Sequence, residues 1–261
     1  MGEYVDLNGV RTYYEVHGAS NDEPLVLLHG GMATAETWGP QIEALSQRYR
    51  LYVPERRGHG HTHDVEGPLT YHLMAGDTVA FLKEVVGGSA HLVGWSDGGI
   101  VALHVALRDP DLVSKLVLIG ANFHYEGGLV TPDEMGLTAD GPELAIFRSM
   151  YEAASPDGPE HWPVVVDKII RMWTEEPTLT TKDLASIQAA TLVLVGDDDM
   201  PALGHTVELY ESLPRGQLAV VPGASHFVPT ERPALVNELI LDFLVSGEPQ
   251  TLMPMRRRRE G

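Results

Sequence analysis

The stretch HLVGWSDGGIVALHVAL, residues 91–107, decides the fold. An apolar run stops at Gly94, and a second run with helical spacing begins at Ile100, so the stretch predicts a buried strand, a tight turn and a helix. Ser96 lies in the turn within the pattern Gly-x-Ser-x-Gly, and the glycines remove side chains that would clash there. In this context the pattern predicts a nucleophile elbow, with the serine hydroxyl at a helix N-terminus that favours a developing anion.

Composition limits the possible classes of protein. The chain has 261 residues, 43% of them hydrophobic, which is enough for one large domain with a full core. It has no cysteine, which excludes disulfides, thiolate metal sites and a cysteine nucleophile. A net charge of −19 predicts a surface that repels nucleic acid and anionic membranes. We see no signal peptide and no membrane-spanning run, so we expect a cytoplasmic location. We also expect a monomer or homodimer, and no cofactor or metal.

Short apolar runs alternate with helical patterns along the chain, which predicts an α/β sheet with mostly parallel strands. Asn8-Gly9 separates the first two expected strands and is a strong hairpin signal, so the sheet should open with an antiparallel pair. The expected strands are 4–7, 11–16, 25–28, 51–53, 91–93, 116–119, 192–195 and 218–221. The expected helices are 35–47, 71–86, 99–107, 206–213 and 233–245.

The alternation breaks between residues 122 and 189, where apolar residues recur mostly at helical spacing and no buried strand is evident. We interpret this segment as a helical cap inserted into the α/β core, and a few ordinary crossover helices are the alternative. The expected domains are therefore core at 1–121 and 190–247, with the cap at 122–189 between them. Residues 248–261 include the run MRRRRE and are expected to form a disordered tail.

A serine nucleophile needs a base, and the base needs an acid that orients it. His226 follows the last expected strand and is the predicted base. Three adjacent acids, 197–199, end the preceding expected strand, and one of them is the predicted orienting acid. His59, His61 and His63 alternate and could suggest a metal site, but glycine spacers and the lack of a carboxylate or cysteine cluster argue against it.

Two backbone N–H groups are needed to hold the oxyanion of the reaction. One is expected from Asp97, the residue after the serine. The other is expected from the loop His29-Gly30-Gly31-Met32, whose glycines let the backbone approach a substrate closely. Asp97 itself has two interpretations: an acid that gains about 0.3–1 kcal/mol from the helix dipole, or a negative charge in the pocket that favours ammonium-bearing substrates.

Over essentially its whole length the chain resembles the α/β-hydrolase superfamily. The matching pieces are LLHGG at 27–31, ERRGHGHT at 55–62, GWSDGG at 94–99, VLVGDDD at 193–199 and GASHF at 223–227. The resemblance implies an eight-stranded, mostly parallel sheet with helices on both faces and a helical cap. It also implies Asp199 as the triad acid and Gly31 as an oxyanion donor. Glu55 departs from the family, which often has Asp in that structural turn.

Residues 94–99, together with Gly-Ala-Asn at 120–122, resemble the valacyclovir hydrolase branch of the superfamily. There the acid after the serine holds the α-amino group of amino-acid esters, which implies that role for Asp97. Met32, which follows the LLHGG motif, and Trp95 and Asn122, which lie within the matching motifs, are expected to contact the substrate.

We therefore expect a serine hydrolase that cleaves small carboxylic esters through an acyl-enzyme, with Ser96, His226 and Asp199 as triad. Carbon–carbon bond hydrolysis, amide hydrolysis or perhydrolysis on the same triad are alternatives, because fold analogy does not decide the reaction. A non-catalytic ligand receptor of the same fold is a further alternative.

Overall fold

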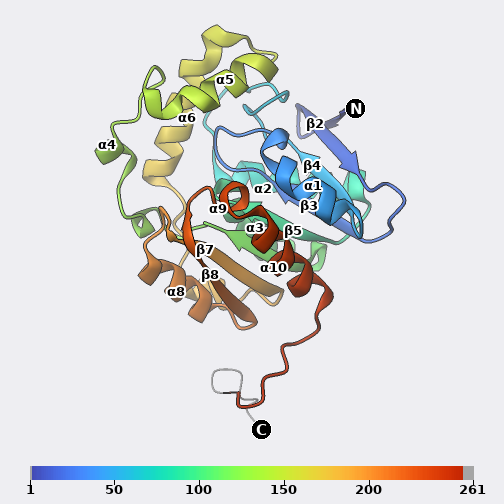
Figure 1. The fold of residues 1–261 in the computed structure, drawn as a ribbon. Helices are drawn as coiled ribbons and strands as arrows, with labels where there is room; N and C mark the ends of the chain where they lie inside the picture. The colour runs from blue at the N-terminus through green and yellow to red at the C-terminus, as the bar shows by residue number, and fades with distance from the viewer. Residues whose placement is uncertain (1, 255–261) are drawn as a thin grey trace.

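The computed structural model of the chain describes residues 2–254, which are built around an eight-stranded sheet (Figure 1). The strands lie in the order β1-β2-β4-β3-β5-β6-β7-β8, with β1, β2 and β4 paired antiparallel and the rest parallel. They are β1 (Glu3–Leu7), β2 (Val10–His17), β3 (Pro24–Leu28), β4 (Arg50–Pro54), β5 (Ala90–Trp95), β6 (Val113–Ile119), β7 (Ala190–Asp198) and β8 (Gly216–Ser225). The predicted α/β-hydrolase fold is confirmed, including its opening hairpin, where Asn8 and Gly9 both have positive φ.

Helices cover both faces of the sheet, and each face has its own apolar core. Successive β3 residues alternate between the cores: Leu25 and Leu27 face one and Val26 and Leu28 the other. The first core includes α1 (Gly39–Ser46) and α10 (Pro233–Val245). The second includes α2 (Tyr71–Phe81), α3 (Asp97–Arg108) and α8 (Leu203–Ser212). The inner parallel strands β3, β5 and β6 are thus mostly buried on both sides, which is why they read as continuous apolar runs, whereas the edge strand β8 is partly exposed.

Several expected helices differ from the structure in their bounds or their type. The helix expected at 35–47 is a 3₁₀ turn, η1 (Ala35–Trp38), followed by α1, because Pro40 lacks an N–H and restarts the helix. The helix expected at 71–86 is α2 followed by a π turn, η2 (Leu82–Val86). The helix after the elbow starts at Asp97 rather than residue 99, directly after Ser96.

The segment between β6 and β7, residues 120–189, contains helices and an isolated β-bridge between His124 and Thr178, and a second bridge joins its Gly128 to Pro201 after β7. Its longer elements are α4 (Pro132–Met135), α5 (Ala145–Ala154), α6 (Trp162–Glu175) and α7 (Thr181–Leu184). The segment also contains three short 3₁₀ turns, η4 (Tyr125–Gly127), η5 (Pro142–Leu144) and η6 (Pro159–His161). Outside it, η3 (Pro110–Leu112) precedes β6, and the short helix α9 (Val228–Glu231) precedes α10. In Figure 1 α5 and α6 lie beyond one edge of the sheet.

Buried residues of α6, among them Val165, Ile169 and Met172, belong to the same apolar core as α2 and α3. The division into core and cap domains stays a prediction. Of the expected tail, residues 255–261 lie outside the described residues. Within 2–254, no helix has both the length and the apolar character that crossing a bilayer requires.

Candidate active site

Ser96 lies in the sharp turn between β5 and α3. Its backbone has φ 54° and ψ −121°, a conformation that is costly for any residue with a side chain. A side chain on Gly94 would overlap the backbone of Gly98, and one on Gly98 would overlap the Leu28 carbonyl at the end of β3. The Ser96 N–H donates to the Ile119 carbonyl of β6 at 2.7 Å, which ties the turn to the neighbouring strand. The glycine spacing in the sequence therefore follows from the close contact between α3 and two strands.

Three of the predicted site residues form a continuous hydrogen-bonded chain. His226 follows β8, and its Nε2 lies 2.9 Å from Ser96 Oγ. Its Nδ1 lies 2.6 Å from Asp199 Oδ1. Met200 N–H also donates to Asp199 Oδ1 at 2.7 Å, and Gly196 N–H to Oδ2 at 3.1 Å, so the carboxylate is held in one orientation. The order from acid to imidazole to hydroxyl is the one that activates a serine.

The other two acids of the Asp197–Asp199 run lie elsewhere. Asp197 Oδ1 accepts hydrogen bonds from the N–H groups of Gly223 and Ala224 and so braces β8. Asp198 is exposed at the end of β7. Asp199 is thus the one of the three that contacts His226, as the family spacing implied.

The loop after β3 approaches Ser96 closely, as expected for an oxyanion site. A side chain at Gly30 would contact the Ser96 side chain, and one at Gly31 would collide with Asp97 and Trp173. The Asp97 N–H is in the first turn of α3, where backbone N–H groups have no acceptor within the helix. Glycine at position 31 therefore leaves room beside both expected N–H donors.

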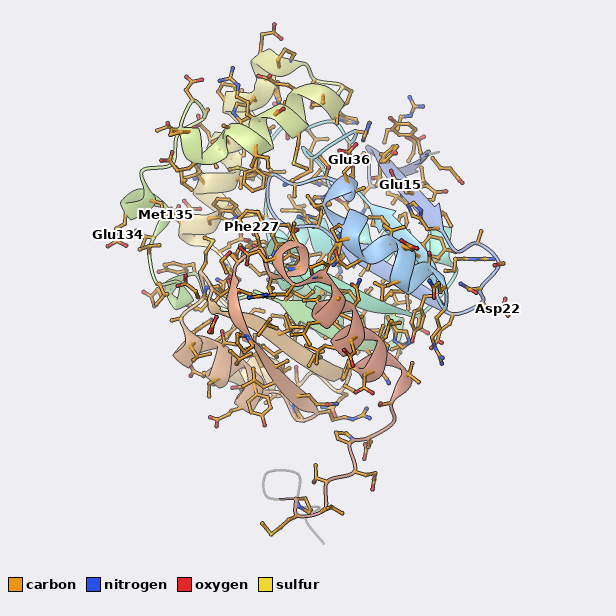
Figure 2. The ribbon with its side chains drawn as sticks, in the orientation of Figure 1. Glu15, Asp22, Glu36, Glu134, Met135 and Phe227 are labelled. Atoms are coloured by element: carbon orange, nitrogen blue, oxygen red, sulfur yellow. The ribbon has the colours of Figure 1, made fainter. Side chains whose placement is uncertain are left out.

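A cavity of about 430 Å³ opens above Ser96, and its walls are mainly apolar. Gly31, Trp95, Asp97 and Asn122 of the predicted site line it. Met135 of α4 and Phe227, after β8, line it as well (Figure 2). Met32 was expected here, but it is buried in the sheet core at 4% exposure and is not among the described residues that line the cavity. The backbone at Met32 has φ 57°, a tight-turn conformation, and the side chain packs into the core.

Trp95 lines the cavity, but most of its side chain is buried beneath the site. Its side chain is 5% exposed and belongs to the apolar core beside α1 and α10. Its Nε1–H donates to the His226 carbonyl at 2.8 Å, which fixes the turn that carries the imidazole. Asn122 donates from Nδ2 to the His124 carbonyl at 2.9 Å.

The Asp97 carboxylate is buried in the cavity wall and held by two neutral donors. Tyr71 Oη–H donates to Oδ1 at 2.8 Å, and Trp173 Nε1–H lies 3.0 Å from Oδ1 and 3.1 Å from Oδ2. Burial raises the pKa of Asp97, against the attraction of the Arg56 guanidinium and the two hydrogen bonds. Arg56 is itself occupied by the carbonyls of His29 and Gly30. Because a buried carboxylate is poorly hydrated, a cationic partner in the cavity would stabilise its charge.

The charged side chains that line the cavity are all acidic. They are Asp97, Glu143 and Glu176, and no lysine or arginine is among the described lining residues. Glu176 Oε2 also accepts the Tyr71 N–H at 3.0 Å. A cavity with this lining favours neutral or cationic ligands over anionic ones.

Sequence reasoning missed Tyr71, Trp173 and Glu176. Tyr71 resembles any residue that opens a helix, and the other two lie in the segment that matched no motif. His59 and His61, considered for a metal, serve the turn after β4: His59 Nδ1 lies 2.9 Å from the Arg57 carbonyl, and His61 Nδ1 lies 3.0 Å from Glu55. Burial lowers the pKa of His59 to about 3.

Glu55 replaces the aspartate often found in this turn and still fills the same structural position. It is buried and accepts hydrogen bonds from the N–H groups of Ala35 and His61.

Comparison with known proteins supports the same fold. The chain is 28% identical to "Putative carbamate hydrolase RutD" of Azorhizobium caulinodans over 251 residues, which covers 88% of this chain and 94% of that protein. It is 26% identical to carboxylesterase YbfK of Bacillus subtilis over 271 residues, covering 94% and 88%. The meta-cleavage product hydrolase CumD of Pseudomonas fluorescens superposes with a TM-score of 0.80 at 24% identity, covering 94% of this chain and 97% of that one. A model of the alpha/beta hydrolase family matches residues 25–239, and the chain therefore belongs to that family.

Proposed function

We propose that this protein is a serine hydrolase that cleaves carboxylic esters and favours esters of α-amino acids. The observation that carries the proposal is the chain Asp199–His226–Ser96 at the floor of a mainly apolar cavity, with contacts of 2.6 and 2.9 Å. Such an arrangement raises the nucleophilicity of a hydroxyl that is otherwise too weak to attack an ester.

In the acylation step, Ser96 Oγ attacks the ester carbonyl and its proton passes to His226 Nε2. Asp199 keeps the Nδ1–H of the imidazole directed at itself and stabilises the imidazolium that forms. The carbonyl oxygen becomes an oxyanion, which the N–H groups of Gly31 and Asp97 stabilise. The imidazolium then donates its proton to the alcohol oxygen as that bond breaks, which leaves an acyl group on Ser96.

In the second step, His226 takes a proton from water, and the water oxygen attacks the acyl carbon. The same N–H groups hold the second oxyanion. Collapse of this intermediate returns the proton to Ser96 Oγ and releases the carboxylic acid, so the step consumes one water for each ester. No metal or organic cofactor is needed in this sequence.

The acidic lining supports this substrate class over those of some relatives. One relative, from Burkholderia cepacia, is named as a hydrolase of 2-hydroxy-6-oxo-6-phenylhexa-2,4-dienoate, a carboxylate. An anion of that kind would enter a cavity whose charged residues are Asp97, Glu143 and Glu176. The same repulsion applies to a free carbamate anion. A protonated amine on the substrate is attracted instead, and the buried Asp97 lies directly beside the nucleophile.

The proposal is tested with neutral esters, α-amino esters, a carbamate and a dienoate, using the purified protein and the Ser96→Ala variant. We expect ester turnover that falls at least ~10³-fold in Ser96→Ala and in His226→Ala. Circular dichroism should show that both variants fold. Ester hydrolysis by Ser96→Ala near the wild-type rate would refute the mechanism. Turnover of the dienoate alone would assign carbon–carbon hydrolysis instead, and turnover of nothing in the panel would favour a ligand receptor.

A further inference from the structure

Polar contacts connect helix α6 to the rest of the protein at three points, two within the helix and one just after its end. Near its middle, Lys168 reaches Asp64 in the loop between β4 and α2. Near its end, Trp173 donates to Asp97 beside the nucleophile, and Glu176, just after the helix, accepts from the Tyr71 backbone. Two of these contacts lie in the cavity, and the first lies outside it.

The contact outside the cavity is a cluster centred on a buried carboxylate. Lys168 Nζ lies 2.5 Å from Asp64 Oδ2 and 2.7 Å from the Val65 carbonyl. His161 Nε2, immediately before α6, lies 2.9 Å from the same Oδ2. The Asp64 N–H donates to Asp157 Oδ2 at 2.6 Å. We call Asp64, Asp157, His161 and Lys168 the Asp64 latch.

The Asp64 side chain is 4% exposed, so its charge depends on these partners. Burial by itself would raise the pKa of Asp64, but the hydrogen bonds from Lys168 and His161 outweigh it and lower that pKa. Asp64 Oδ1 is buried without a hydrogen-bond partner within the described part of the chain. Removing a partner from such a group leaves a buried charge uncompensated, so α6 is strongly favoured in the one position where Lys168 reaches it.

The rest of the packing of α6 is less directional. Its buried residues, such as Val166 and Ile169, belong to the apolar core, and the hydrophobic effect that buries them does not by itself select one direction of contact. Trp173 lies five residues beyond Lys168, or about 7.5 Å along a helix. Because both residues belong to the same helix, a shift of α6 at Lys168 also moves the Trp173 indole.

We propose that Asp64 is a positioning residue for the cavity: through Lys168 and His161 it fixes the position of α6, and thereby holds the Trp173 indole against Asp97. The latch residues are not among the residues that line the cavity within the described range. Their effect on substrate selection is therefore indirect, and that functional part of the inference rests on the proposed ester hydrolysis.

The structural part is tested without any activity, in the Ser96→Ala background. The chain has four tryptophans, so ¹⁵N-labelled protein gives up to four indole N–H signals, and Trp173→Phe assigns one of them. We expect Asp64→Asn and Lys168→Gln to shift the Trp173 signal and to raise its solvent exchange about tenfold, since local opening governs exchange. The buried Trp38 signal should not change. Glu66→Gln, an exposed acid in the same loop, is the matched control, and Lys168→Arg should restore part of the protection.

An unchanged Trp173 signal in both latch variants would overturn the proposal. A uniform rise in exchange at all indoles would overturn it too, because the latch would then contribute to global stability alone. In the active protein, Lys168→Gln should raise KM for an α-amino ester by a larger factor than it lowers kcat. It should add little to that change in a Trp173→Phe background, since both substitutions remove the same contact. Absence of ester turnover would refute the proposed function, but the indole measurement would still test the position of α6.

Discussion

Replacing Asp97 by asparagine should abolish the preference for α-amino esters and spare the chemistry. The substitution keeps the shape of the side chain and keeps Oδ1, which accepts from Tyr71 and Trp173. It removes the charge and the acceptor capacity of Oδ2, which faces Gly31. A carboxylate oxygen accepts more than one hydrogen bond, so Oδ2 can accept from a substrate ammonium as well as from Trp173 at 3.1 Å. The backbone N–H of residue 97 is unchanged, so the oxyanion should still be stabilised.

The size of the preference follows from the environment of the carboxylate. A hydrogen bond to a charged group contributes about 1.5–3 kcal/mol. Two donors already share the charge of Asp97, which places the contribution near the lower end, about 1.5–2 kcal/mol or ~10- to 30-fold in kcat/KM. Part of this should appear in kcat. The Asp97 carboxylate lies close to Gly31, so its charge opposes an oxyanion that develops beside that residue until an ammonium offsets it.

The assay compares benzyl alaninate with benzyl isobutyrate, in which a methyl group replaces the ammonium at nearly constant shape. We expect the wild type to favour the alaninate at pH 6.5 and to lose that preference above about pH 8, as the amine loses its proton. Asp97→Asn should bring the ratio near one at both pH values. Asp198→Asn makes the same change in net charge at an exposed position and should keep the preference. A wild-type ratio near one, or a ratio that survives Asp97→Asn, would refute the reasoning.

Three further predictions follow from the same structure. Asp199→Asn should lower kcat by ~10³-fold or more, because the imidazole loses its orienting partner, whereas Asp198→Asn should change it less than about threefold; the reverse order in steady-state kinetics would move the role to the neighbour. Burial lowers the pKa of His104 to about 4, below about 6.5 when unfolded, so its roughly 3 kcal/mol of stability is present above pH 6.5 and is lost as pH falls toward 4. Chemical denaturation across this range should show a shallower pH dependence in His104→Phe, and an identical slope would contradict the assignment. Lengthening the alcohol chain of the ester should raise kcat/KM by up to about fourfold per CH₂ while it fills the apolar cavity, and a flat series would argue against that cavity as the binding site.

The parts of the molecule that could be predicted are those in which local sequence dictates backbone geometry. The elbow is one, because only glycine fits where α3 contacts β3, and that requirement leaves a spacing visible around Ser96. The hairpin at Asn8-Gly9 and the buried parallel strands are others. The family spacing also selected Asp199 among three adjacent acids, and its Oδ1 lies 2.6 Å from His226 Nδ1.

The surroundings of Asp97 could not be predicted, because they depend on contacts between residues distant in the chain. Tyr71 and Trp173 come from different helices, and neither has a local signature that marks it as a partner of the carboxylate. The failure at Met32 has a different cause. Its place next to the glycine pair suggested the pocket, but its backbone has a tight-turn conformation and its side chain packs into the core.

The crowding around the elbow also determines where this protein can acquire a new specificity. Positions 94, 96 and 98 are fixed by backbone contact and chemistry, and position 95 carries an indole that fills the core and supports His226. Position 97 is different: its side chain enters the cavity one residue from the nucleophile, while its main chain is held by the helix. A saturation library at this single position, with Tyr71 and Trp173 varied alongside to match, would sample new substrate charges and leave the hydrolytic machinery in place. Natural evolution of the protein has the same route available, since a change of one codon there alters which substrates bind and leaves the residues around Ser96 and His226 in place.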